Sequence, residues 1–315
     1  MTGSMASMGP TGPSGPTRGA VGAVGFVGLG NIGKPMAQRL LVGTGAEDAV
    51  DLWVYDVAPD PVAELTAAGA KSAGSVAELA ELVDTLCVMV RDDDQVREVL
   101  SEVLGVADRR DQGRPLTVVV HSTVAPDTPA SLAETARPYG VRVVDAPVSG
   151  GPMGAADGTL AIMVGGSDEA YAAVEPTLRR MGSKVLHAGP IGAGTKFKLA
   201  RNLLHFVAFA AATEAQRLAE AAGLDLVALG DVVRHTDQIT GGPGAIMHRD
   251  TAAPIPEGDF WHGVFGHVRA LGEKDLRFAI ALAEQLEVDL PLSRLALDRL
   301  GPGLGLPEET HRHGP

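Results

Sequence analysis

The chain has 315 residues, more than a single hydrophobic core usually supports, so we expect two domains. Hydrophobic residues make up 45% and charged residues 21% of it, which is typical of soluble globular proteins. The net charge of −13 argues against a nucleic-acid surface or a polybasic membrane contact. No apolar run reaches the about 18 residues of a membrane span without a polar break. Cys87 is the single cysteine, so the chain has no intrachain disulfide and no thiolate metal cluster, and we expect a cytoplasmic protein.

Residues 1–20 are rich in Gly, Pro, Ser and Thr and have no apolar period, which predicts a disordered leader. A short apolar strand over residues 21–27 follows, and after it the pattern G-x-G-x-x-G opens a helix. Gly28 permits a tight turn, Gly30 lets the backbone approach a pyrophosphate, and Gly33 allows close packing of helix on strand. The predicted dinucleotide-binding turn consists of Gly28, Leu29, Gly30, Asn31, Ile32 and Gly33.

The second strand, LWVYD, ends at Asp56, 23 residues after Gly33. A carboxylate about 20 residues after the glycine motif binds the ribose 2′-hydroxyl and repels a 2′-phosphate. NAD is therefore favoured over NADP. The chain contains 40 glycines, so a fortuitous glycine-rich turn is the alternative, but the strand, helix and acid around this one favour a nucleotide site.

Strands and helices then alternate as far as residue 190, which predicts a parallel sheet with its ligand beyond the carboxyl ends of the strands. Expected helices cover residues 61–68, 78–82, 94–104, 127–139 and 168–181. Three strand ends are candidate contacts: Val90 with Arg91, Ser122 with Thr123, and Ser149 with Gly150 and Gly151. The hydroxyl and glycine amides of DAPVSGG can cradle a carboxylate, and a plain polar loop is the alternative. His121 and His187 lack a partner at metal-ligand spacing, so we expect structural histidines and no metal.

One long helix is predicted from Gly192 to about Ala222, because no Gly or Pro interrupts the pattern after Gly194. Its length would be about 40 Å, with Thr195 as its N-cap. Residues 203–212 are apolar nearly all round, which predicts burial on every side. Lys198 and Asn202 stand four residues apart and share one face, where they can hold a proton and a substrate oxygen. The alternative is that Lys198 is a solvated lysine of the first turn.

After residue 222 the strand pattern ends, and helices are expected over residues 226–234 and 263–285 and from Pro291 onward. The loop over residues 239–250 has no assignment. The predicted organisation is a leader (1–20), a dinucleotide-binding domain (21–190), an all-helical substrate and dimerisation domain (191–305) and a flexible tail (306–315).

Four stretches in order, GFVGLGNIGKPMA, DAPVSGG, GAGTKFKLARN and KDL, together resemble the β-hydroxyacid dehydrogenases. This family contains 3-hydroxyisobutyrate dehydrogenase, tartronate semialdehyde reductase and the 6-phosphogluconate dehydrogenases, and the resemblance covers residues 21–300. It implies an α/β fold in which a Rossmann-like parallel-sheet N-terminal domain is joined by a long helix to an all-α C-terminal domain.

The resemblance also implies roles for individual residues. Lys198 would be the catalytic acid/base, Asn202 would contact the substrate, and Lys274 would close over the cofactor. The substrate carboxylate would lie at Thr123, Ser149, Gly150 and Gly151, and the cofactor would also contact Val90, Arg91, Ser122 and Thr123. Two departures from the family pattern are Arg201, where many members have an asparagine, and VRDDD, where Leu-Pro is usual.

The predicted function is NAD-dependent hydride transfer from the 3-hydroxyl of a small acid similar to 3-hydroxyisobutyrate. The alternatives are a non-catalytic dinucleotide-binding module and a reductase of another small aldehyde such as tartronate semialdehyde. A 6-phosphogluconate-type decarboxylase is disfavoured by the short helical half, an imine reductase by Lys198, and a metal-dependent alcohol dehydrogenase by the lack of a Cys/His cluster. The apolar helical half predicts a homo-oligomer, a dimer or tetramer.

Overall fold

The computed structural model describes residues 22–42, 50–110 and 114–306. It divides the chain into two compact units, of which the first ends at Ala200 and the second begins at Arg201. The predicted leader and all of the predicted tail except Leu306 lie outside the described residues.

The first unit contains a nine-stranded sheet within its described residues. The strand order is β3-β2-β1-β4-β5-β6-β8-β7, with β9 paired to β8. The strands are β1 (Val24–Val27), β2 (Leu52–Tyr55), β3 (Lys71–Ser72), β4 (Thr85–Val88), β5 (Thr117–Val120), β6 (Arg142–Asp145), β7 (Val148–Ser149), β8 (Ala161–Gly165) and β9 (Lys184–Gly189). Strands β1 to β6 pair in parallel, as predicted, whereas β8 runs antiparallel to β6 and β7. The predicted Rossmann-like fold is confirmed, with a mixed rather than wholly parallel sheet.

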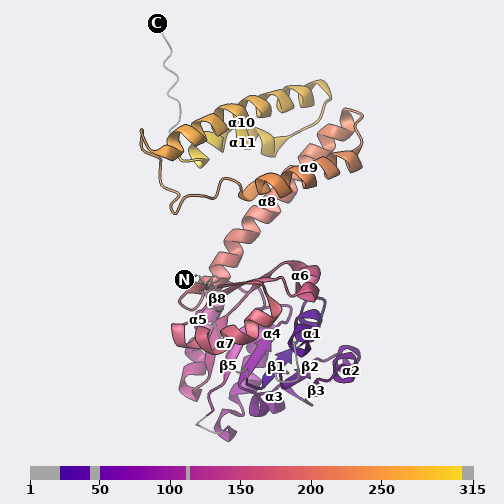
Figure 1. Ribbon diagram of the computed structural model, residues 1–315, viewed down its shortest axis with the longest axis vertical. Helices are drawn as coiled ribbons and strands as arrows, with labels where there is room; N and C mark the ends of the chain where they lie inside the picture. The colour runs from indigo at the N-terminus through magenta and orange to yellow at the C-terminus, as the bar shows by residue number, and fades with distance from the viewer. Residues whose placement is uncertain (1–21, 43–49, 111–113, 307–315) are drawn as a thin grey trace, which may run out of the picture. The chain divides into compact units, whose positions relative to one another are not determined.

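The central strands β1, β4 and β5 are buried along their whole length because helices cover both faces of the sheet (Figure 1). Apolar residues of α1 and α7 pack on one face, and those of α3, α4 and α5 pack on the other. The helices are α1 (Gly33–Leu41), α2 (Pro59–Ala67), α3 (Val76–Leu82), α4 (Asp93–Leu104), α5 (Thr128–Ala136), α6 (Gly151–Asp157) and α7 (Asp168–Met181). The connections reverse direction between β1 and β4, and in such sheets the ligand crevice opens at the carboxyl ends of the strands at this point.

The described residues of the second unit form helices and loops with no strand, which confirms the predicted all-α C-terminal part. Its helices are α9 (Leu226–Thr240), α10 (Phe260–Gln285) and α11 (Pro291–Gly303), and α8 (Ala193–Ala221) begins in the first unit and continues into this one. The unit has one small cluster of buried apolar side chains, formed by Ile255, Phe265, Leu304 and Leu306. The carboxylate of Glu214, on α8, accepts hydrogen bonds from the amides of Leu292 and Ser293 and so ties α8 to the first turn of α11.

The apolar run of α8 differs from the prediction, because it is exposed rather than buried on every side. Leu203 is 70% exposed and Phe206 60%, and Val207 and Phe209 are exposed as well. An all-round apolar pattern indicates that a helix needs cover, but it does not say that the same chain provides it. The described part of one chain leaves this face of α8 open.

The predicted N-cap of α8 is also wrong. The helix begins at Ala193, so Thr195 lies inside its first turn. The Thr195 hydroxyl is buried and has no hydrogen-bond partner among the described residues. The acceptor at this helix start is instead the carboxylate of Asp145, which is far away in the sequence. Local sequence rules for capping do not identify such a partner.

No helix in the described part of the chain is long and apolar enough to cross a membrane.

Candidate active site

The glycine motif forms the turn between β1 and α1, and the space around its glycines fits a bound dinucleotide. Gly28 has a φ of 89°, and a side chain there would overlap the Met89 carbonyl oxygen. A side chain at Gly33 would overlap the Gly28 carbonyl oxygen, so the helix packs tightly on the turn. By contrast, a Cβ at Gly30 would meet nothing within 4 Å, which leaves the backbone open to a phosphate. In the first turn of α1 the amides of Lys34 and Met36 donate to carbonyl oxygens of the glycine turn, and residue 35 is a proline without an N–H. The anion would therefore bind at the amides of residues 30–33, at the start of the helix.

The carboxylate of Asp56, at the end of β2, lies beside this turn. It accepts hydrogen bonds from the amides of Leu29 (2.5 Å) and Ala58 (2.8 Å), which fix its position next to the glycine loop. A cavity of about 330 Å³ adjoins it, and Gly28, Gly30, Asp56, Val90 and Arg91 are among the residues that line it. The structure thus brings together predicted cofactor residues from three separate loops.

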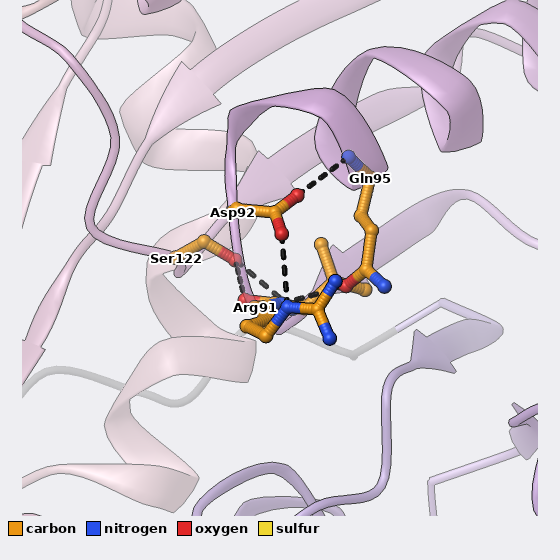
Figure 2. A network of polar contacts seen from close by, with 5 residues as sticks. Arg91, Asp92, Gln95 and Ser122 are labelled. Carbon is orange, nitrogen blue, oxygen red and sulfur yellow. Dashed lines mark hydrogen bonds and ion pairs between the residues drawn. The ribbon is translucent and has the colours of Figure 1, made fainter.

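A polar network links the end of β4 to the start of α4 and, through Ser122, to the end of β5 (Figure 2). The side chain of Arg91 is 79% exposed and its Nε donates to Asp92 at 2.9 Å. The carboxylate of Asp92 also caps α4 by accepting from the Gln95 amide at 3.0 Å. The Gln95 hydrogen bond and, after it, the contact with Arg91 lower the pKa of Asp92. The departure from Leu-Pro in this segment therefore leaves a charged side chain at the rim of the cavity.

Ser122 joins β4 to β5 by its hydroxyl. The hydroxyl oxygen accepts from the Val90 amide at 2.9 Å and donates to the Val90 carbonyl at 2.7 Å, and Ser122 is 2% exposed (Figure 2). The side chain is thus used to position Val90, while the neighbouring Thr123 is exposed. Cofactor contacts at these two residues stay a prediction.

The loop after β7 contains the second predicted cluster. Ser149 is half-buried, and Gly150 (φ 134°) and Gly151 (φ 62°) follow it with backbone conformations that favour glycine. A Cβ at Gly151 would meet nothing within 4 Å, so its backbone is accessible. Successive amides in unusual backbone conformations form concavities that bind carboxylates.

Lys198 lies in the second turn of α8 and is only 8% exposed. Its Nζ donates to the Val148 carbonyl oxygen at 2.6 Å. The alternative of a solvated first-turn lysine is therefore wrong. Val148 directly precedes Ser149 in the chain. The structure therefore brings together the predicted acid/base and the predicted carboxylate loop.

Asp145 is a buried charged residue of this site that the sequence reasoning missed. It is 0% exposed, and its carboxylate accepts from the amides of Gly192 (2.7 Å) and Thr195 (2.6 Å) at the start of α8. The available signal was an acid at the end of an otherwise apolar strand, VRVVDAP. An acid in such a position requires hydrogen-bond donors, although the sequence does not say which ones.

The remaining predicted site residues lie in the second unit. Asn202 is half-buried, and its Oδ1 accepts from the Arg201 guanidinium at 3.3 Å. Lys274, on α10, is ion-paired with Asp275 at 3.0 Å, and its side chain is 53% exposed. The contacts of Asn202 with substrate and of Lys274 with cofactor stay predictions.

The two histidines near the strand ends have contacts within the protein. The Nδ1 of His121 lies 2.8 Å from the Ala146 carbonyl oxygen, its ring stacks on Phe26, and burial lowers its pKa to about 4. The Nε2 of His187 lies 2.8 Å from the Gly166 carbonyl oxygen, and its ring stacks on Tyr171. No group of three or more His, Cys, Asp or Glu side chains in the described residues could hold a metal ion.

The fold and the glycine turn define a dinucleotide-binding oxidoreductase, and comparisons with known proteins agree. Residues 23–189 match the model for the NAD-binding domain of 6-phosphogluconate dehydrogenase, and residues 192–300 match the NAD-binding model of NADP-dependent 3-hydroxyisobutyrate dehydrogenase. The chain therefore belongs to the β-hydroxyacid dehydrogenase family and binds NAD(P).

Individual relatives cover nearly the whole chain. An uncharacterized oxidoreductase of Mycobacterium tuberculosis is 51% identical over 88% of this chain and 92% of its own length. A solved structure of an oxidoreductase from Mycobacterium avium is 47% identical, covers 91% of this chain and 99% of its own, and has a TM-score of 0.84. The 3-hydroxyisobutyrate dehydrogenase of Pseudomonas aeruginosa is 35% identical over 85% of this chain and 87% of its own length.

Proposed function

We propose that this protein oxidises the 3-hydroxyl group of a small 3-hydroxy acid with NAD, and that Lys198 is the general acid/base. The observation that carries the proposal is the position of the Lys198 ammonium, which is buried and bound to the Val148 carbonyl next to the Ser149 loop. A buried amine beside a loop that can bind a carboxylate is arranged for proton transfer on an acid substrate.

In this proposal the substrate carboxylate binds at Ser149, Gly150 and Gly151. The hydroxyl lies against Lys198, and Asn202, one turn further along α8, contacts the same oxygen. As the neutral amine, Lys198 takes the hydroxyl proton while the substrate is oxidised. As the ammonium that results, it returns that proton to the carbonyl oxygen in the reverse direction. When bound, the nicotinamide of the cofactor supplies the hydride acceptor.

The preference for NAD is also proposed, and it is supported by Asp56. The carboxylate is held beside the glycine turn by two amides and lines the adjoining cavity. The segment after it, Val57 to Asp60, contains no cation that could bind a 2′-phosphate. Replacing Asp56 by Ala should reduce the ratio of kcat/KM for NAD to that for NADP by about tenfold or more, because it removes a repulsive charge. An unchanged ratio would refute the role of Asp56.

The test of the reaction is NAD reduction at 340 nm with 3-hydroxyisobutyrate, 3-hydroxypropionate, glycerate, serine, β-phenylserine and 6-phosphogluconate. Lys198→Ala should then reduce kcat by about 100-fold to 10,000-fold, as expected for loss of a general acid/base, and leave the Kd of NAD unchanged. Lys196→Ala is the matched control, because Lys196 is an exposed lysine two residues earlier on the same helix. Full activity of the Lys198 variant would refute the proposed mechanism.

Two other functions remain as alternatives. A reductase of another small aldehyde, such as tartronate semialdehyde, would use the same residues and is distinguished by NADH oxidation with that aldehyde. A non-catalytic module would bind NAD without turnover of any acid or aldehyde. The burial of Lys198 favours an enzyme, because burying a lysine side chain costs free energy and a non-catalytic NAD-binding module would not need a buried lysine.

We also propose that the protein is a homo-oligomer. The second unit exposes large apolar side chains on α8, α9 and α10, including Phe206, Val227 and Phe260, and a soluble monomer rarely exposes so many. A second copy of the chain would cover them, and light scattering should give at least twice the mass of one chain. A monomer at micromolar concentration would refute this.

A further inference from the structure

The start of α8 is held by one carboxylate. Asp145 is fully buried, its Oδ1 accepts from the Gly192 amide and its Oδ2 accepts from the Thr195 amide. Gly192 comes directly before the helix and Thr195 lies in its first turn, where amides lack partners within the helix and negative charge is stabilised. Because each carboxylate oxygen is bound to an amide and the group is shielded from solvent, Asp145 does not reach a substrate itself.

The strand after Asp145, β7, binds the side chain of Lys198 through the Val148 carbonyl oxygen. Val148 lies three residues after Asp145, and Lys198 lies three residues after Thr195. Two hydrogen bonds, Asp145–Thr195 and Val148–Lys198, therefore join the β6–β7 segment (residues 142–149) to α8. The hydrogen bond of Asp145 fixes the backbone of α8, and that of Val148 fixes the ammonium group of Lys198.

Close backbone packing leaves the helix start little freedom to move. A Cβ added to Gly194 would overlap the Met163 carbonyl oxygen and lie 2.9 Å from the carbonyl oxygen of Asp145. A Cβ added to Gly165, which pairs with Asp145, would lie 2.9 Å from the Ala193 amide nitrogen. The first turn of α8 thus rests directly on the backbone of β6 and β8, the strands before and after the carboxylate loop.

We infer that Asp145 is a positioning residue that sets the place of the Lys198 ammonium against the Ser149 to Gly151 loop by anchoring the first turn of α8. This inference rests on the proposed function only in that Lys198 is the acid/base. The expected effect on rate is large, because a displacement of about 1 Å at a reacting group can cost about 100-fold in rate. The glycine turn and Asp56 lie on other strands, so cofactor binding should not depend on Asp145.

The test compares Asp145→Asn with Glu214→Gln. The asparagine keeps one acceptor oxygen but turns an NH₂ group toward the second amide. Glu214 is the matched control, because it is also a buried carboxylate (4% exposed) that accepts from two amides at a helix start, those of Leu292 (2.7 Å) and Ser293 (2.8 Å). If Asp145→Asn does not fold, Asp145→Ser, which is smaller and keeps one acceptor, takes its place.

With the acid that the panel identifies as substrate, Asp145→Asn should lower kcat at least tenfold and leave the Kd of NAD unchanged. Glu214→Gln should lower the Tm but change kcat less than twofold. In a Lys198→Ala background, Asp145→Asn should have no further effect on the residual rate, because it acts through the lysine. Equal loss of kcat in the two carboxylate variants, or an additive loss in the double variant, would overturn the inference.

A second measurement does not depend on turnover. The chain has six lysines, so selective ¹³Cε labelling gives few NMR signals, and Lys198→Arg identifies that of Lys198. Asp145→Asn should shift this signal, whereas those of Lys34 and Lys274 should stay in place and Glu214→Gln should shift none of the three. An unmoved Lys198 signal would refute the anchor even if Lys198 is catalytic. A shifted signal together with a fully active Lys198→Ala would refute the catalytic role alone.

Discussion

The stability of the first unit should fall with acid because of His121. This residue is 1% exposed, and burial holds its pKa at about 4 against an ordinary 6.5. Above pH 6.5 the ring is neutral in both the folded and the unfolded chain and has no effect on the pH dependence. Below pH 6.5 the unfolded chain takes up a proton that the folded chain refuses, so the free energy of unfolding decreases until the pH reaches about 4.

The two pKa values give the size of this effect. The loss is about 2 kcal/mol at pH 5 and about 3 kcal/mol at pH 4, from the proton-linkage relation for a single site. Urea unfolding followed by circular dichroism between pH 7.5 and pH 4 measures it. Other titrating groups contribute as well, and the comparison with His121→Leu removes them, because only the histidine term differs between the two proteins.

The His121→Leu variant loses the hydrogen bond to the Ala146 carbonyl oxygen and should be less stable than the wild type at pH 7. Its stability should then decrease less on acidification, so the two curves converge by about 2 kcal/mol between pH 7 and pH 5. Parallel curves would show that His121 takes up a proton as easily in the folded as in the unfolded protein. Such a result would refute the reasoning from burial.

Three further predictions concern single residues. Burial raises the pKa of Cys87 to about 12, so its thiol should not react with a disulfide reagent at pH 8 until the protein is unfolded in guanidinium. Gly194→Ala should destabilise the protein by about 2 kcal/mol or more, measured as a loss of Tm, because the methyl group would overlap backbone atoms of a neighbouring strand. Gly263→Ala should instead raise the stability by about 0.5–1 kcal/mol, because this exposed helical glycine has nothing within 4 Å of its Cβ position; a loss of Tm would contradict that expectation.

The parts of the fold that depend on local pattern could be predicted from the sequence. The glycine turn, the acid at Asp56 and the alternation of strands and helices each depend on residues close together in the chain. From these residues the longer strands of the sheet and the helices α1 to α5 and α7 were predicted to within a few residues. The strands β3 and β7, of two residues each, and the short helix α6 were missed, because such short elements carry no periodic pattern. The reversed direction of β8 was also missed, because apolar strand patterns do not carry direction.

Features that depend on distant partners could not be predicted. The cap of α8 comes from Asp145, 50 residues before the amide of Thr195 that it binds, so a local rule assigned Thr195 instead. Burial of Lys198 likewise depends on the carbonyl of Val148, and the sequence alone left a solvated lysine open. The exposed apolar face of α8 follows the same logic, since the amount of apolar surface can be predicted from the sequence while the molecule that covers it cannot.

The two hydrogen bonds between the β6–β7 segment and α8 also show which positions of this segment can be varied in protein engineering. Asp145 and the Val148 carbonyl are hydrogen-bonded to α8, so changes at these positions would also move Lys198, the proposed acid/base. Ser149 comes directly after Val148 and is half-buried. Under the proposed function, a library at Ser149 would change which acid is accepted and leave the position of Lys198 unchanged.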